Sequence, residues 1–255
     1  MHPQRVGRLE RLLVPISMHR FFTEEILPNR AVVRGEDVKH LTRVLRLGAG
    51  DAVQLCDGQG RECDAVIAAV TPDSVSFDTQ PWRESPSEPQ HRVTLCQCLP
   101  KTGKMETILQ KCVELGADAF VPVLSERCVV QPKESFQARI SRWQRVSMEA
   151  AKQSRRGRIP RVAPLTPLAQ LDFSPFDTVL VAYEDEHTVT LKAALRQGVG
   201  EKIAVLIGAE GGFSAQEIAA LCSRGAVPVS LGARILRTET AGMAMLAQIL
   251  YEVEP

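Results

Sequence analysis

Residues 92–255 alternate between two hydrophobic periods, and this alternation constrains the fold more than any other feature of the chain. Apolar runs such as RVTLCQCL, AFVPVLS, TVLVAYE and KIAVLIG have the length of buried strands. Between them stand segments with apolar residues at helical spacing, among them KMETILQKCVEL, with Gly116 as its C-cap, and FQARISRWQRVSMEAAKQS. Parallel strands need such crossovers. The pattern therefore predicts an α/β domain with helices on the faces of a parallel sheet.

The last predicted helix, ETAGMAMLAQILYE, is apolar nearly all round from Ala241 to Leu250. A terminal helix of this kind is buried either in the core or against another subunit. Its apolar surface exceeds what one core-facing stripe requires, so we expect a homodimer that forms through this helix.

Residues 18–80 consist instead of short alternating segments, DAVQLCD, RECDAVIAAV and DSVSFDT. The stretches between them, DGQG and TPD, suit hairpin turns, and the pattern predicts a small β-barrel. One helix-like piece, DVKHLTRVLR, interrupts it. Its apolar face holds Val38, Leu41, Val44 and Leu45, and its other face holds Lys39, His40, Arg43 and Arg46.

Two segments are predicted to lie outside the domains. Residues 81–91, within QPWRESPSEPQH, carry prolines and little apolar content, which is typical of a linker. Residues 1–17 have no periodic apolar pattern, and their LLVPI run is too short for a signal-peptide core, so we expect a dispensable, disordered extension. No apolar run approaches the roughly 20 residues that span a membrane, so we expect no membrane partner.

Charge and cysteine content narrow the partners. Lys and Arg total 31 against 30 acids, so the net charge of +1 predicts no polyanion partner by itself. The seven cysteines include no C-x-x-C pair, which favours reduced thiols in a cytoplasmic protein and predicts no metal site. Any nucleic-acid surface would have to be a local patch.

Such a patch is predicted between Arg139 and Arg161, where eight basic residues accompany a single acid, Glu149. A merely solvated helix face would usually interleave acids, so the asymmetry favours nucleic-acid binding over that alternative. The segment LPKTGKME adds Lys101 and Lys104 at the end of a predicted strand.

A glycine-rich stretch, LIGAEGGFSAQE, marks a candidate ligand loop at residues 206–217. Ser214 and Glu217 form a capping box that starts a helix, so GAEGG follows the carboxyl end of a strand, where open α/β sheets bind ligands. The stretch matches neither a phosphate-binding nor a dinucleotide-binding loop, and Glu210 disfavours an anion. The loop suits a neutral or cationic ligand; the alternative is a tight turn with a solvated glutamate.

A second unusual loop, SLGARILRTETAG, follows the last predicted strand. Gly232 ends the strand, Arg234 and Arg237 are three residues apart, and Thr238 or Thr240 can cap the terminal helix. The alternative is a basic loop before a buried helix. Two such loops at one edge of a sheet are less coincidental than either alone.

The motifs IGAEGG, SLGARILRTETA, AAKQSRRGRIP and KCVELGA, with HRFF and HLTRVLRLGAGD near the start, resemble the RsmE-type 16S ribosomal RNA uridine-N3 methyltransferases of the SPOUT superfamily. The resemblance runs from about Met18 to Tyr251. It implies a PUA-like β-barrel for RNA over residues 18–80 and a SPOUT methyltransferase domain over residues 92–255, with a parallel sheet and a trefoil knot. It further implies a cytoplasmic homodimer that binds S-adenosyl-L-methionine in the knot.

The resemblance also implies the reaction, which is methylation of N3 of one uridine (m3U1498) in 16S rRNA, on the assembled small ribosomal subunit. Two alternatives stay open. One is another SPOUT RNA methyltransferase acting on a tRNA ribose or base, and the other is a non-catalytic RNA-binding assembly factor. The glycines of both loops speak against the second, because a degenerated pocket need not keep them.

Site residues follow by motif match. S-adenosylmethionine carries a sulfonium cation and no phosphate, so a glycine loop with a carboxylate suits it. The cofactor would be lined by Ala182, Tyr183, Glu184, Ile207, Gly208, Glu210, Gly211, Gly212, Leu231, Gly232, Ile235, Leu236 and Arg237. RNA would contact Arg20, His40, Arg43, Arg46, Lys101, Lys104, Arg155, Arg156 and Arg158; the family usually has a glycine in place of Arg155.

The catalytic assignments are drawn from the same loops. The uridine N3 proton must leave, and negative charge then spreads onto O2 and O4. Glu210 and Glu239 are candidates for the base. Arg156 and Arg237 are candidates for stabilising the developing charge, and much of the rate could come from alignment alone.

Overall fold

The computed structural model describes residues 18–101, 103–130 and 136–254. They form two compact units. The first contains the described residues up to Cys56 together with Glu62–Trp82, and the second contains Asp57–Arg61 and the chain from Arg83 onward. The predicted extension at residues 1–17 lies outside the described residues.

The first unit is a curled sheet with strand order β1-β4-β5-β6-β3-β2. The first and last strands of this path, β1 and β2, are consecutive in the sequence. Thr23 lies between them and makes hydrogen bonds to both β4 and β3. Its N–H donates to the Cys56 carbonyl, and its hydroxyl donates to the Val32 carbonyl. The sheet thus closes on itself around a core that includes Phe21, Leu55 and Phe77. The strands are β1 Arg20–Phe22, β2 Glu25–Leu27, β3 Arg30–Arg34, β4 Ala52–Cys56, β5 Arg61–Val70 and β6 Ser74–Thr79.

The predicted helix of this unit is short and changes its winding. An α-helical turn, α1 (Glu36–Lys39), leads into a π-helical segment (His40–Val44), in which the Leu45 N–H donates to the His40 carbonyl. The wider π turn rotates each later residue away from α-helical spacing. Val38 and Leu41 are buried as predicted, but Val44 is 66% exposed, so its predicted place on the apolar face is wrong.

The second unit is the predicted α/β domain. Its sheet has the order β10-β9-β8-β13-β12-β14, with all of these pairs parallel, and β11 also pairs with β9. The strands of this sheet are β8 Arg92–Cys98, β9 Ala119–Leu124, β10 Arg161–Val162, β11 Thr166–Pro167, β12 Thr178–Ala182, β13 Lys202–Ile207 and β14 Val227–Val229, and the short strand β7 (Arg83–Glu84) is not part of it.

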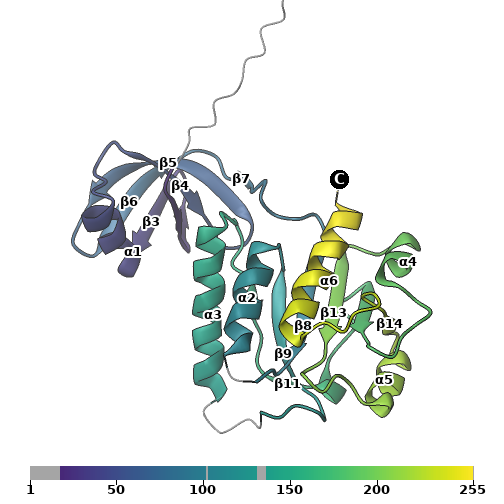
Figure 1. The fold of residues 1–255 in the computed structure, drawn as a ribbon. Coiled ribbons are helices and arrows are strands. Elements are labelled where there is room, and N and C mark those ends of the chain that lie inside the picture. The colour runs from purple at the N-terminus through teal and green to yellow at the C-terminus, as the bar shows by residue number, and fades with distance from the viewer. Residues whose placement is uncertain (1–17, 102, 131–135, 255) are drawn as a thin grey trace, which may run out of the picture. The chain divides into compact units, whose positions relative to one another are not determined.

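Helices cover this sheet, and on one face α2 lies between α3 and α6 (Figure 1). Gly116 follows α2 with φ +103°, which confirms its predicted place at the end of that helix. The helices are α2 Lys104–Glu114, α3 Phe136–Gln153, α4 Leu191–Arg196, α5 Ala215–Cys222 and α6 Thr238–Val253, with a 3-10 turn at Leu168–Gln170.

Helix α6 buries one face rather than its whole circumference. Met245, Leu246 and Ile249 are buried, whereas Ala247 and Gln248 are exposed. Six of the seven cysteines are buried, and Cys222 is exposed. Among the described residues, no helix is long and apolar enough to cross a membrane, and no group of three or more His, Cys, Asp or Glu side chains is arranged to hold a metal ion.

Candidate functional site

Three loops meet at the carboxyl edge of the parallel sheet, after β12, β13 and β14. They begin at Ala182, Ile207 and Val229. β12 pairs with both β13 and β14, and parallel strands end at the same edge, so the loops are neighbours. The Tyr183 N–H donates to the Val229 carbonyl at 3.2 Å, which ties the first loop to the third. This is the position at which open α/β sheets bind ligands.

The glycine loop is folded tightly on itself. The Gly212 N–H donates to the Ala209 carbonyl at 3.0 Å, and a Cβ on Gly208 would lie 2.9 Å from the Gly212 Cα. Gly212 has φ +63°, and a Cβ there would overlap the Glu184 carboxylate. Backbone and carboxylate can approach this closely only because the two residues have no side chain.

The predicted capping box is confirmed. The Ser214 hydroxyl accepts from the Glu217 N–H at 3.2 Å, and the Glu217 carboxylate accepts from the Ser214 N–H at 2.9 Å. The segment after β9 braces the same loop, because Arg127 Nη1 donates to the Gly211 carbonyl at 2.8 Å and the Glu126 N–H donates to Glu217 at 2.8 Å. No pattern in the sequence predicted this brace.

Lys104 gathers the two predicted catalytic acids. Its Nζ lies 3.0 Å from Glu210 Oε1 and 3.0 Å from Glu239 Oε2, and the Lys101 N–H also donates to Glu210 at 3.1 Å. The predictions that placed Lys104 among RNA contacts did not foresee this cluster. A lysine at the start of a helix carries no sequence signal that names its partners on remote loops.

This arrangement lowers the pKa of both acids. Partial burial opposes ionisation of Glu210, but hydrogen bonds from Lys104 and the backbone outweigh it and lower its pKa. Backbone hydrogen bonding at Glu239, with Lys104 beside it, outweighs burial and lowers the pKa of that carboxyl as well. Hydrogen bonds from the Lys104 ammonium to the two carboxylates raise the pKa of Lys104, and the bond to Glu210 has the larger effect. All three groups are therefore charged at neutral pH, and the two carboxylates are weak bases.

A buried polar chain connects the glycine loop to the start of α6. Thr238 Oγ1 donates to the Gly208 carbonyl at 2.6 Å, and Gln97 Nε2 donates to Thr238 Oγ1 at 2.9 Å. Gln97 and Thr238 are both buried. Their hydrogen bonds therefore hold the start of α6, where the loop after β14 ends, against the glycine loop after β13. Gln97 was missed at the sequence level, since one polar residue in an apolar strand indicates burial without indicating a partner.

The remaining residues predicted to line the cofactor differ in exposure. Leu231 and Leu236 are half-buried, and Arg237 is exposed at the N-cap of α6. Gly232 has φ +115° in the loop after β14, which ends three residues earlier, at Val229, than predicted. Ile235 is 89% exposed, an unusual state for a large apolar side chain.

Comparisons with known proteins bear on these loops. Residues 86–250, more than half of the chain, match the family model of an RNA methyltransferase domain, and residues 33–80 match that of an RNA methyltransferase PUA domain. Ribosomal RNA small subunit methyltransferase E of Bacillus subtilis is 34% identical over 93% of this chain and 98% of its own length. The chain belongs to the ribosomal RNA small subunit methyltransferase E family.

Solved methyltransferase structures match the fold as well. The methyltransferase E from Neisseria gonorrhoeae, bound to S-adenosyl methionine, has a TM-score of 0.80 at 29% identity and covers 92% of this chain and 98% of its own. A putative methyltransferase from Legionella pneumophila in complex with the same cofactor has a TM-score of 0.77 at 28% identity, with the same coverages. The SPOUT methyltransferase class and the N-terminal PUA-like unit are thus confirmed.

Arg156, predicted both to contact RNA and to stabilise charge, is buried in this family member. The residue is 3% exposed. Its guanidinium pairs with Glu88 at 2.6 Å and donates to the carbonyls of Val113 and Ala117. Its donors are occupied by the protein's own acceptors, so this placement favours a structural role.

Arg158 and Arg20 are also engaged internally. Arg158 Nε lies 3.4 Å from Asp118 Oδ1 and 3.8 Å from Glu88 Oε2, with its guanidinium against Gly60. Arg20 forms an ion pair with Glu62. By contrast, His40, Arg43 and Arg46 in the PUA-like unit, and Lys101 and Arg155 in the methyltransferase domain, are exposed.

Replacing Arg156 by alanine is expected to destabilise the methyltransferase domain. It would leave the Glu88 carboxylate, whose side chain is only 12% exposed, without its closest cation. Breaking a buried pair in this way costs about 3–5 kcal/mol. Denaturant unfolding measures the effect, with Arg155→Ala as the exposed neighbouring control. Equal unfolding midpoints for Arg156→Ala and wild type would contradict a structural role.

Arg155 adopts φ +58°, in the left-handed region that glycine tolerates best. Arg155→Gly is therefore expected to stabilise the protein by up to about 1 kcal/mol, because relief of left-handed strain exceeds the added unfolded-state entropy. The matched control is Arg145→Gly, at an exposed position inside α3, which should destabilise by about 1 kcal/mol. Thermal unfolding of both variants tests the contrast.

Proposed function

We propose that the protein methylates N3 of a single uridine in 16S rRNA with S-adenosylmethionine, acting on the assembled small ribosomal subunit in the cytoplasm. The observation that carries this proposal is the Gly208–Gly212 turn packed against Glu184 at the carboxyl edge of the sheet, with the Lys104 cluster beside it. Family membership supports the RNA substrate, and the uridine follows from the resemblance of the loop motifs.

The residues present fit the cofactor. When bound, S-adenosylmethionine supplies an electrophilic methyl group on a sulfonium cation. The side-chain-free surface of the glycine turn permits close approach of a ligand, and the carboxylates of Glu184 and Glu210 at this turn suit a cation. The trefoil knot, and the lining residues from the loops after β12 and β14, stay predictions of the resemblance.

Lys104, Glu210 and Glu239 together form an ionic cluster. In the reaction, we assign this cluster to positioning the loops rather than to proton abstraction. Lowered pKa values make Glu210 and Glu239 poor bases at neutral pH. Lys104 holds both carboxylates at the start of α2, which fixes the loop beside them. Arg237, exposed at the N-cap of α6, can stabilise negative charge that develops on the uracil oxygens. Alignment of N3 with the methyl group would supply much of the rate.

The deciding experiment separates this function from its two rivals. Small subunits from a strain that lacks the modification are incubated with the protein and labelled S-adenosylmethionine, and modified nucleosides are mapped by mass spectrometry. N3-methyluridine in 16S rRNA is the expected product. Methylation of tRNA instead would favour another SPOUT activity. No cofactor binding by calorimetry would favour an assembly factor and overturn the proposal.

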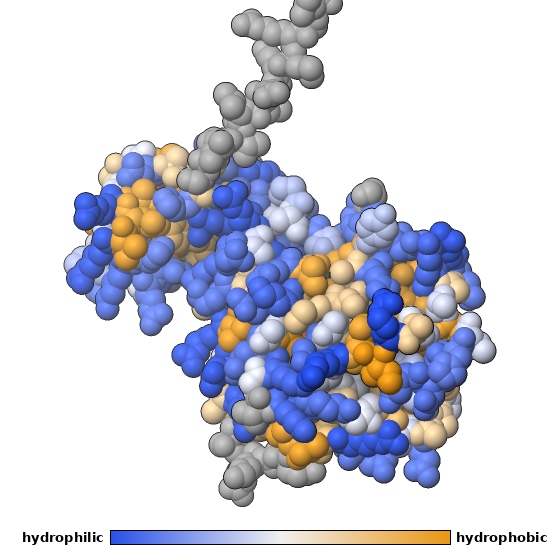
Figure 2. Space-filling view, in the orientation of Figure 1, coloured by the Kyte–Doolittle hydropathy of each residue, from blue (hydrophilic) through white to orange (hydrophobic). Residues whose placement is uncertain are grey.

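We also propose that the protein is a homodimer that uses the outer face of α6 and the loop before it. Figure 2 shows apolar side chains gathered over this region. Ile235 in the loop is 89% exposed, and Tyr251 on α6 is 88% exposed. Exposed apolar patches of this kind mark interaction surfaces. Light scattering at micromolar concentration should give the mass of two chains, and Ile235→Glu should shift it toward one. A monomer mass for wild type would refute the proposal.

A further inference from the structure

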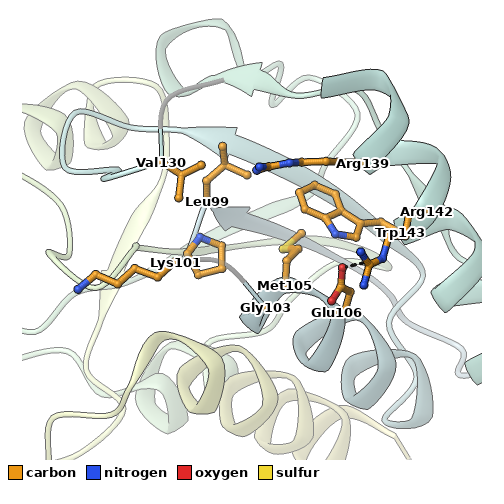
Figure 3. Close-up of a pocket in the computed structure, with 10 residues that line it drawn as sticks. Leu99, Lys101, Gly103, Met105, Glu106, Val130, Arg139, Arg142 and Trp143 are labelled. Atoms are coloured by element: carbon orange, nitrogen blue, oxygen red, sulfur yellow. Dashed lines mark ion pairs between the residues drawn. The ribbon is translucent and has the colours of Figure 1, made fainter. Parts of the chain in front are cut away.

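A cavity of about 170 Å³ lies in the methyltransferase domain, between the loop after β8 and helix α3 (Figure 3). Its inner wall is apolar, because Leu99, Met105 and Trp143 are buried side chains. Figure 3 shows the Trp143 indole between the side chains of Arg139 and Met105, opposite Leu99 and Val130. The cavity is thus lined by aliphatic groups and by the small accessible part of a largely buried indole ring.

The rim of the cavity is cationic. Among its lining residues, Lys101, Arg139 and Arg142 face a single acid, Glu106. Arg142 Nε pairs with Glu106 Oε1 at 3.1 Å, so this acid is already neutralised, and the remaining charge at the rim is positive. An apolar interior with a positive rim suits a flat apolar group that carries a negative charge next to it.

The cavity adjoins the proposed reaction site through one short loop. Lys101 and Gly103 line the cavity, whereas the Lys101 N–H donates to Glu210 and the Lys104 ammonium pairs with Glu210 and Glu239. A larger groove between α2 and α3 shares Gly103, Glu106 and Arg142 with the cavity. An extended chain could therefore run from the groove past the cavity to the ionic cluster.

Size limits the occupant. Pockets for whole cofactors or drug-sized ligands measure about 300–1,000 Å³, so a cavity of about 170 Å³ accommodates one small flat group and not S-adenosylmethionine. A nucleobase is such a group, and its phosphates supply the negative charge that the rim would bind. Single-stranded RNA is commonly recognised by this combination of unstacked bases on aromatic side chains and cations on the backbone.

We propose that this cavity binds one unstacked nucleobase of the RNA substrate, a neighbour of the target uridine, and so holds that uridine in register with the ionic cluster. Lys101 and Arg139 would contact the adjoining phosphates. This inference rests on the proposed function and deepens it, because it assigns a second base-binding position beside the reaction site. An apolar peptide side chain is the rival occupant, and the test below distinguishes it.

Trp143 provides a direct readout. The protein has two tryptophans, so Trp82→Phe leaves Trp143 as the single indole. In this background we titrate the four nucleoside 5′-monophosphates and record indole fluorescence, with ribose 5-phosphate as the probe that lacks a base. At least one nucleotide should quench saturably, and ribose 5-phosphate should not. Quenching by none of the four would overturn the proposal and leave the peptide as occupant.

Two adjacent valines give matched variants. Val130 lines the cavity, whereas Val129 is 68% exposed and is not among the lining residues. Val130→Phe should fill the cavity and weaken nucleotide binding about tenfold or more, and Val129→Phe should leave it unchanged. Val130→Phe should also raise KM for small subunits while calorimetric affinity for S-adenosylmethionine stays at the wild-type value.

The results separate the two proposals. Equal nucleotide affinity in both valine variants would place the base elsewhere and overturn this inference, even if methylation proceeds as proposed. Absence of methylation by the wild type would overturn the proposed function, whereas the quenching titration would still decide whether the cavity takes a base.

Discussion

Gly212→Ala is expected to weaken S-adenosylmethionine binding at least about tenfold while the domain stays folded. Gly212 has φ +63°, and an added Cβ would overlap the Glu184 carboxylate, so either the turn or the acid must move. Strain of this kind amounts to about 1–3 kcal/mol, and every 1.4 kcal/mol lost from binding is about a factor of ten in affinity. Isothermal titration calorimetry measures the change.

Gly225→Ala is the matched control for this variant. Gly225 also has a positive φ, +90°, but a Cβ there meets nothing within 4 Å. Both substitutions place a Cβ at a positive φ, and Gly212→Ala adds the overlap with Glu184, so thermal stability should fall in both variants and further in Gly212→Ala. Only Gly212→Ala should lose cofactor affinity. Unchanged affinity in Gly212→Ala would exclude the glycine turn as the cofactor site.

Lys104→Met is expected to reduce the single-turnover methylation rate on the order of a hundredfold. Without the ammonium group, the Glu210 and Glu239 carboxylates lose their shared partner and repel each other, so the loops that carry them shift. A displacement of about 1 Å at a reaction site costs on the order of a hundredfold in rate. Lys111→Met, which removes an exposed lysine of the same helix that pairs with Glu114, should leave the rate unchanged.

The pH dependence of this variant follows from the lowered carboxyl pKa values. In the wild type, the contribution of these carboxylates to stability is fully present above their unfolded pKa of about 4.3 and is lost as pH falls through the lower folded values. Their pKa values should rise in Lys104→Met. The difference in melting temperature between variant and wild type should therefore be largest near neutral pH and shrink on acidification. A difference in melting temperature that is constant with pH would show that Lys104 does not stabilise the ionised forms of these carboxylates.

Local sequence patterns were sufficient to predict several elements of the fold. The capping box at Ser214 and Glu217 involves two residues that are three positions apart. The glycine after α2 is required by the positive φ at that single residue. The strand–helix alternation predicted the parallel sheet, because each crossover is encoded within its own segment. Where a local pattern failed, as at Val44, the backbone had changed to a π turn that α-helical spacing does not describe.

Partners that are distant along the chain were decided by the tertiary structure alone. Lys104 meets Glu210 and Glu239 across 106 and 135 positions, and Arg156 meets Glu88 across 68. A basic residue has the same appearance in sequence whether it faces RNA or a buried carboxylate, so the predicted RNA patch included Arg156. Local sequence patterns indicated which loops stand at the sheet edge and which glycines they contain. Only the folded chain determined which charges those loops bring together, because ion pairing depends on distance in space and burial rather than on separation along the chain.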